Sequence, residues 1–142
     1  MQNPPKRKDS YLCSEGGDMD NINLKVKLYL ENEQDKFMGI GVLWILQKVE
    51  TCGSLRAATE EMGISYSKAF RMIENLESSV GVPVLERRKG GMQRSGAKLT
   101  PFGKAFIALY DDFQKNCKAL LEKPFEKFSD ELSALVSEHA KA

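Results

Sequence analysis

The sequence is poor in the residues that build metal and redox sites. It has a single histidine, His139, and three cysteines, Cys13, Cys52 and Cys117, which form no C-x-x-C pair. This sparse, odd-numbered set argues against a disulfide framework and against a zinc site, because both need several ligands at set spacings. We therefore expect no metal, no cofactor and a reducing, cytoplasmic environment.

Long apolar runs and an excess of charge are also missing. No apolar stretch approaches the roughly 18 residues that a membrane-spanning helix needs, so no membrane partner is expected. The 21 Lys and Arg residues nearly balance the 20 Asp and Glu residues, which leaves a net charge of +1. Any nucleic-acid surface must therefore be a local patch. The sequence also lacks a Ser-His-Asp set, a nucleophile elbow and a plausible pair of catalytic carboxylates, so we expect no enzyme.

The chain divides into three segments. Residues 1–21 are polar and rich in Pro and Gly, without the apolar core of a signal peptide, and are predicted to be a disordered leader. Residues 22–122 carry the patterns of regular structure and form the predicted domain. Residues 123–142 form a C-terminal tail with a helical pattern. A chain of 142 residues suits one compact domain with some tail.

The predicted domain begins with a strand and continues with three helices. Apolar and polar residues alternate over residues 22–31, which indicates a half-buried strand, and a loop over 32–39 follows. The next apolar residues are spaced three or four apart, and each helical segment ends at a glycine. These glycines are Gly53, Gly63 and Gly81. Ser54 and Ser65 stand where the second and third helices need N-caps.

A hairpin and a long helix complete the pattern. Extended segments at residues 82–85 and 97–99 flank a stretch of basic and glycine residues, which predicts a β-hairpin. Thr100-Pro101 is typical of a helix start, with Thr as N-cap and Pro as the first helical residue. Pro124 is expected to break this fourth helix. The apolar spacing of residues 125–136 predicts a short tail helix.

The second and third helices, joined at a tight glycine turn, predict a helix-turn-helix, and the hairpin after them predicts a wing. The third helix would present its N-terminal turn and outer face to the major groove of DNA. Hydroxyls at a helix start suit phosphate, and long cationic side chains reach phosphate or guanine edges. The candidate contacts on this helix are Ser65, Tyr66, Ser67, Lys68 and Arg71. The alternative is a three-helix core with a merely solvated polar face.

The hairpin concentrates positive charge. Six basic residues and one acid lie between positions 86 and 104, and each phosphate that they neutralise would release counterions and add affinity. A solvated charged loop is the alternative. A nucleotide-binding loop at Gly90-Gly91 is set aside, because the G-K-[ST] ending is missing. The candidate wing contacts are Arg87, Arg88, Lys89, Arg94 and Lys98.

The fourth helix carries an apolar stripe that is longer than a small domain needs. The stripe consists of Phe102, Phe106, Leu109, Phe113, Cys117 and Leu120. We expect it to form a homodimer interface with the same helix of a second, antiparallel copy. The alternative is an ordinary core face.

Taken together, these pieces resemble the winged-helix N-terminal domain of ModE-type molybdate-responsive regulators, over roughly residues 23–121. The matching pieces are Gly53-Ser54-Leu55, Ala57-Ala58, Met62-Gly63, Ser65-Tyr66-Ser67-Lys68-Ala69, Leu85-Glu86-Arg87-Arg88, Gly90-Gly91, Gly96-Ala97 and Leu99-Thr100. The core is also similar to LysR-type DNA-binding domains, which share Gly81-Val82-Pro83 and Leu99-Thr100. The resemblance implies a dimeric transcription factor on a palindromic operator. Full-length ModE regulators bind molybdate in a separate C-terminal domain, and we expect no such effector domain here.

The sequence thus predicts a mainly α winged helix-turn-helix domain with an N-terminal strand, a β-hairpin wing and a long C-terminal dimerisation helix. The predicted function is a transcriptional regulator that binds double-stranded DNA as a homodimer. The family name implies a link to genes for molybdate, tungstate or other oxyanion transport. A winged-helix module for protein–protein interaction is the alternative, favoured by the acids Glu60, Glu61 and Glu74. A third hypothesis, a small-molecule sensor enzyme or an oxyanion carrier, is supported only by the family name.

Overall fold

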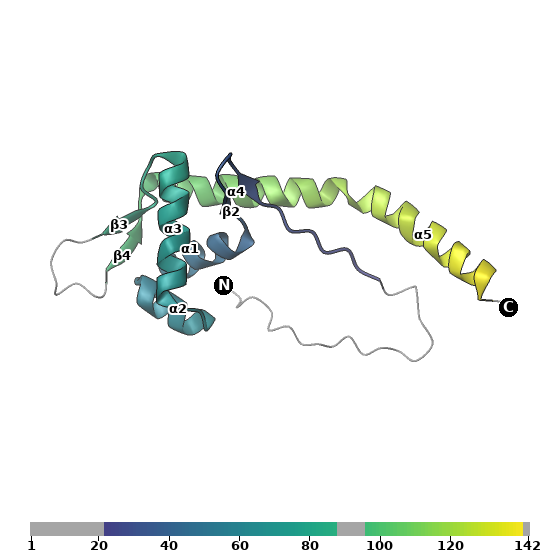
Figure 1. The fold of residues 1–142 in the computed structure, drawn as a ribbon, viewed down its shortest axis with the longest axis horizontal. Helices are drawn as coiled ribbons and strands as arrows, with labels where there is room; N and C mark the ends of the chain where they lie inside the picture. Colours follow the sequence, from purple (N-terminus) through teal and green to yellow (C-terminus); the bar gives the residue numbers. More distant parts are fainter. Residues whose placement is uncertain (1–21, 88–95, 141–142) are drawn as a thin grey trace. The chain divides into compact units, whose positions relative to one another are not determined.

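The structure, a computed structural model, describes residues 22–87 and 96–140. The chain divides into two compact units, Lys27–Phe113 and a second unit that combines Met1–Val26 with Gln114–Ala142. The first unit holds three helices, both strand pairs and the first part of a fourth helix (Figure 1). The predicted boundaries at residues 21 and 122 stay a prediction. No helix in the two described ranges is long and apolar enough to cross a membrane.

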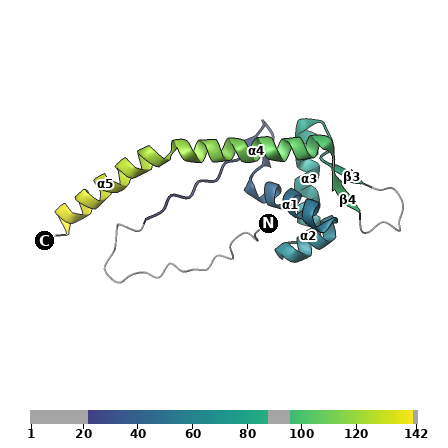
Figure 2. The ribbon, with the colours of Figure 1, turned by 180° about the vertical axis from the view of Figure 1, so that it is seen from behind.

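Three helices build the core of the first unit: α1 (Ile40–Cys52), α2 (Leu55–Met62) and α3 (Tyr66–Val80). They lie close together in both views of the ribbon (Figures 1 and 2). Their inward faces are buried and mostly apolar, as the helical spacing predicted. The fully buried side chains include Leu46, Val49, Ala58, Ala69, Ile73 and Leu76.

The predicted ends of these helices are confirmed. The three glycines that follow α1, α2 and α3 have φ of +72°, +70° and +77°, in the left-handed region that costs glycine little. The Ser54 hydroxyl accepts a hydrogen bond from the Ala57 N–H at 2.9 Å. The Ser65 hydroxyl accepts one from the Lys68 N–H at 3.2 Å. Both serines therefore cap their helices as expected.

The N-terminal strand is much shorter than predicted. Only Leu30–Glu31 form a strand, β1, which pairs antiparallel with β2 (Lys36–Met38) inside the segment that was expected to be loop. The alternating pattern of residues 22–29 was misleading, because a strand also needs a partner for its backbone groups. The carbonyl of Leu28 has a side-chain partner in place of a strand, because the Tyr110 hydroxyl donates a hydrogen bond to it at 2.7 Å.

The predicted hairpin is confirmed at its base. Strand β3 (Leu85–Arg87) pairs antiparallel with β4 (Ala97–Leu99), and Glu86 lies opposite Lys98. The predicted contacts at 88–95 lie outside the described residues. The Thr100 hydroxyl donates to the Pro83 carbonyl at 2.8 Å, which holds the exit of the hairpin against its entrance.

Helix α4 (Pro101–Leu120) begins as predicted, because the Thr100 hydroxyl also accepts from the Gly103 N–H at 2.9 Å. The expected break at Pro124 is wrong by a few residues. The helix ends at Leu120, and α5 (Glu122–His139) starts after a single residue. Pro124 lies inside the first turn of α5, where its missing N–H has no intrahelical partner to lose.

Candidate nucleic-acid interface

The N-terminal half of α3 presents the predicted DNA-contacting side chains to solvent. Ser65 caps the helix, and Tyr66, Ser67, Lys68 and Arg71 follow in its first two turns, all exposed. The opposite face of the same helix is buried in the core, so these side chains cannot turn inward without unpacking the helix. Sequence and structure thus bring five polar or aromatic residues to one end of one helix.

An arginine that the sequence pattern did not single out lies next to this group. Arg56 is the second residue of α2, and its guanidinium lies over the ring of Tyr66, 4.7 Å from the ring centre. Tyr66 in turn stacks on Phe70, with ring centres 6.1 Å apart. Nothing in the local pattern around Arg56 signalled this contact, because the turn between α2 and α3 creates it.

The base of the wing is attached to α1 and α3. The Glu77 carboxylate on α3 accepts hydrogen bonds from the Val84 N–H at 2.8 Å and from the Leu85 N–H at 3.4 Å. The Ala97 N–H donates to the carbonyl of Gly53, the residue that ends α1, at 3.2 Å. These bonds set where the hairpin leaves the helical core.

Only two of the five predicted wing residues lie in the part of the chain that the structure describes. Arg87 ends β3, and Lys98 is exposed on β4. Arg88, Lys89 and Arg94 lie outside the described residues. The assignment of these wing residues to DNA stays a prediction.

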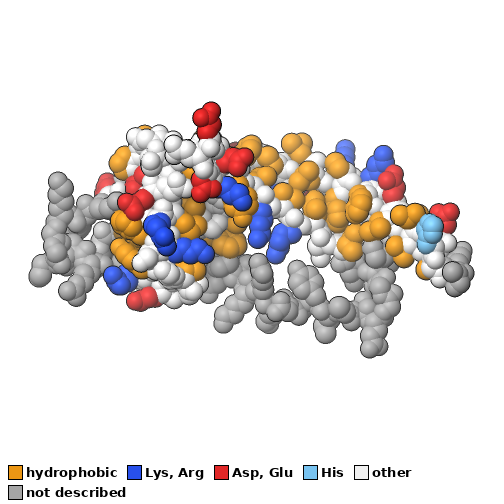
Figure 3. Space-filling view, in the orientation of Figure 1, with side chains coloured by type: hydrophobic (Ala, Val, Ile, Leu, Met, Phe, Trp, Pro, Cys, Tyr) orange, Lys and Arg blue, Asp and Glu red, His pale blue; other side chains and the backbone are white. Residues whose placement is uncertain are grey.

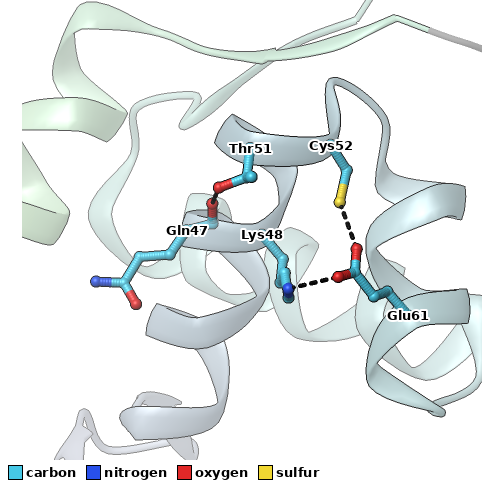
Figure 4. Close-up of polar contacts among 5 residues, drawn as sticks. All are labelled: Gln47, Lys48, Thr51, Cys52 and Glu61. Atoms are coloured by element: carbon cyan, nitrogen blue, oxygen red, sulfur yellow. Dashed lines mark hydrogen bonds and ion pairs between the residues drawn. The ribbon is translucent and has the colours of Figure 1, made fainter. Parts of the chain in front are cut away.

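A polar cluster joins α1 to α2, the first helix of the helix-turn-helix (Figure 4). The ammonium of Lys48, a nearly buried side chain on α1, lies 2.8 Å from one carboxylate oxygen of Glu61 on α2. The Cys52 thiol donates to the other carboxylate oxygen at 3.0 Å. Glu61 is thus occupied within the molecule, which weakens its use as an acid that faces a protein partner.

The cluster changes the acidity of both partners of the thiol–carboxylate bond. The pKa of Glu61 is lowered, mainly because its carboxylate accepts the hydrogen bond from Cys52. The hydrogen bond with Lys48 and the positive charge of Lys48 lower this pKa further. The hydrogen bond to Glu61 raises the pKa of the Cys52 thiol, so this cysteine is held as a thiol and not as a reactive thiolate. Cys52 is half-buried and hydrogen-bonded.

We expect Glu61→Gln to melt at a lower temperature than the wild type at pH 7. The folded state lowers the pKa of Glu61, so its carboxylate stabilises the fold above the unfolded-state pKa. That stabilisation disappears as the pH falls through the lower, folded-state pKa. The gap in melting temperature between wild type and variant should therefore narrow below about pH 4. Circular dichroism melts from pH 7 to pH 3 measure the gap.

The neighbouring exposed carboxylate offers a matched control for this experiment. Glu60→Gln makes the same chemical change one residue earlier on α2, and it should melt like the wild type at every pH. Equal melting temperatures of Glu61→Gln and Glu60→Gln at pH 7 would contradict the role of the cluster.

The stripe predicted as a dimer interface divides into two parts. Phe102 and Phe106 at the start of α4 stack on each other and pack, half-buried, against the core. Further along, Leu109, Phe113 and Leu120 are 70%, 47% and 77% exposed, and Cys117 is half-buried. Apolar side chains remain visible on the surface along α4 and α5 (Figure 3). The distal half of the stripe is thus available to a partner.

The described residues contain no group of three His, Cys, Asp or Glu side chains that could hold a metal ion.

Comparisons with known proteins agree with this geometry. Residues 41–104 match the family described as bacterial regulatory helix-turn-helix protein, lysR family. The structure of the BenM DNA-binding domain with catB site 1 DNA is similar in fold, with a TM-score of 0.50 and 23% identity. That match covers 66% of this chain and 96% of the BenM domain.

The chain is also similar to ModE-type proteins in sequence. It is 33% identical to the molybdenum-pterin-binding protein MopB of Rhodobacter capsulatus, over 63% of this chain and 33% of that protein. It is 28% identical to the DNA-binding transcriptional dual regulator ModE of Escherichia coli K12, over 78% of this chain and 40% of the regulator. The chain thus spans well under half the length of these relatives. Residues 41–104 thus match the helix-turn-helix of the bacterial lysR family, within a chain that resembles the ModE-type regulators as its sequence motifs predicted.

Proposed function

We propose that this chain is a DNA-binding transcriptional regulator that inserts the N-terminal half of α3 into the major groove. One observation carries the proposal: the capped start of α3 holds Tyr66, Lys68 and Arg71 exposed on a helix whose other face is buried. Helix N-termini and hydroxyls bind phosphate, whereas Lys and Arg side chains can bind either phosphate or guanine. The wing residues Arg87 and Lys98 would add contacts beside the groove.

The distribution of charge supports DNA as the partner. The whole chain has a net charge of +1, so non-specific attraction to DNA must come from a local patch. Lys68 and Arg71 lie within one turn of each other on α3, and Lys98 lies on β4. Glu61, one of the acids nearby, is already bonded to Lys48.

We propose further that the regulator acts as a homodimer on a palindromic operator. The exposed apolar side chains of Leu109, Phe113 and Leu120 support this part, because such a surface is costly to leave in water. Helix α5 adds to it, since none of its 18 residues is buried. A two-fold axis between two copies would place two recognition helices on one inverted repeat.

The relatives' names suggest what the operator controls. The proteins that resemble this chain include regulators named ModE and a protein named as molybdenum-pterin-binding. We include genes for molybdate, tungstate or other oxyanion transport among the proposed targets.

Selection from a random DNA library, followed by a salt titration, tests the proposal. The selected sites should contain an inverted repeat with half-sites about one helical turn apart. Binding to such a site should weaken steeply from about 50 to 300 mM salt, because counterions are released from each neutralised phosphate. Failure to enrich any sequence, together with salt-insensitive binding, would overturn the proposal.

A winged-helix module for protein–protein interaction remains the second candidate. Glu60 on α2 and Glu74 on α3 are exposed acids on the helices of the motif, and acids repel phosphate. This candidate predicts no steep salt dependence with DNA, so the same titration separates the two functions.

A further inference from the structure

The contact between Arg56 and Tyr66 joins the two helices of the helix-turn-helix at its exposed edge. Arg56 belongs to the first turn of α2, and Tyr66 is the first residue of α3. Both side chains are exposed, and the Arg56 guanidinium carbon lies 4.7 Å from the centre of the Tyr66 ring. A cation at this distance from an aromatic face is held by the quadrupole of the ring.

The contact continues a stack that is anchored in the core. Tyr66 lies on Phe70 with ring planes 22° apart, and Phe70 is half-buried against the hydrophobic core. The order Phe70, Tyr66, Arg56 thus leads from the interior to the surface. Each group limits the freedom of the next one, so less side-chain entropy remains to be lost when Arg56 binds a ligand.

The cation–π contact is made without a hydrogen bond to an acceptor oxygen, and it leaves the edge of the guanidinium for hydrogen bonding. The edge carries five N–H donors in a fixed plane that matches two oxygens of a phosphate. Among the residues that the structure describes, no carboxylate is paired with Arg56. The guanidinium is therefore an oriented cation beside the start of the proposed recognition helix, with its donors uncommitted to an acid.

We propose that Arg56 binds a backbone phosphate of the DNA whose groove α3 enters, and that Tyr66 positions it. This inference rests on the proposed function and adds a contact from α2 to those of α3 and the wing. A phosphate contact carries no base information, so Arg56 supplies affinity and register to every DNA sequence alike.

The number of phosphates contacted can be measured, which makes the role of Arg56 testable. Arg56→Ala should bind the selected site roughly tenfold more weakly. The slope of log K against log salt should become shallower by about 0.9, the value for one lost phosphate contact. The loss should be the same on an unrelated duplex. Arg56→Lys, which keeps the charge without the planar fork, should keep the slope and lose part of the affinity.

A second cation on a tyrosine ring provides the matched control. Lys36 on β2 lies over Tyr29, 4.8 Å from the ring centre, outside the helix-turn-helix. Lys36→Ala removes one positive charge from the same kind of contact, and it should leave the slope unchanged. Circular dichroism melts confirm that both alanine variants are folded.

The positioning role of Tyr66 is tested by removing the ring. In a Tyr66→Leu background, Arg56→Ala should cost clearly less affinity than in the wild type, whereas in a Tyr66→Phe background it should cost the same. An equal cost in the leucine background would overturn the role of Tyr66. Steep salt dependence of the wild type with an unchanged slope for Arg56→Ala would overturn this inference alone. Salt-insensitive binding by the wild type would overturn the proposed function as well.

Discussion

Replacing both Lys68 and Arg71 with alanine should weaken operator binding by more than about tenfold at fixed salt. The two side chains are exposed in the first two turns of α3 and lie three residues apart, on one face of the helix. A bidentate contact with a base contributes about 1–3 kcal/mol of discrimination, and a lost phosphate contact reduces binding to every sequence. A gel-shift titration with the selected site measures the loss.

The control for this variant removes the same charge elsewhere in the same unit. Lys27 and Lys36 are exposed cations outside the helix-turn-helix, and their double alanine variant should bind nearly as the wild type does at moderate salt. If both double variants lose affinity equally, net charge and not the recognition helix governs binding. An unchanged titration for the Lys68 and Arg71 variant would refute the assignment of α3.

Gly103→Ala should destabilise the fold by about 3 kcal/mol, in the upper part of the range for overpacking. A Cβ at Gly103 would overlap the Val84 carbonyl oxygen and lie 3.1 and 3.2 Å from the carbonyl carbon and Cα of Val84. All three atoms belong to the backbone, which cannot swing aside as a side chain can. The Val84 N–H is bonded to Glu77 and its carbonyl to the Thr100 N–H, so the segment is held on both sides.

A second helical glycine serves as the matched control for this substitution. Gly41, near the start of α1, has only the Met72 methyl within 4 Å of a Cβ, at an ordinary contact distance of 3.6 Å. Gly41→Ala should be neutral, or should stabilise by up to about 1 kcal/mol, because alanine favours a helix over glycine. Urea unfolding followed by circular dichroism measures both variants. A Gly103→Ala variant as stable as Gly41→Ala would show that the backbone of Val84 can move.

The helices could be predicted because their signals are local. The Ser54 and Ser65 hydroxyls cap their helices by accepting a hydrogen bond from the N–H three residues ahead. Gly53 and Gly81 adopt a left-handed backbone conformation that residues other than glycine rarely adopt. Such interactions act within one turn of the chain. They can therefore be read from a short window of sequence.

The errors of prediction arise where distant residues meet. The alternating pattern of residues 22–31 predicted a strand, but only the last two residues of this segment, Leu30 and Glu31, pair with β2. The apolar stripe of α4 was correctly predicted to be helical, yet the buried side chains of α4 are Ile107, Tyr110 and Gln114, which lie beside the stripe. The periodicity predicts that a helix has an apolar face, but it does not predict which element of the fold packs against that face.

The polar contacts around the candidate site show the same limit. Arg56 meets Tyr66 across the turn, and Lys48 meets Glu61 across two helices, 13 positions apart. No short pattern joins either pair, so the sequence indicated the proposed recognition helix without indicating the groups that hold it in place.

The Glu77 carboxylate has a consequence for how mutational data on this interface should be interpreted. It lies on α3 and holds the N–H groups at the entrance of the wing. A tilt of α3 in the groove would therefore shift the hairpin as well, because the two elements are joined and move together. The changes in binding free energy caused by substitutions in α3 and in the hairpin would then not be additive. An operator mismatch read by the helix would also change the cost of contacts made by the hairpin.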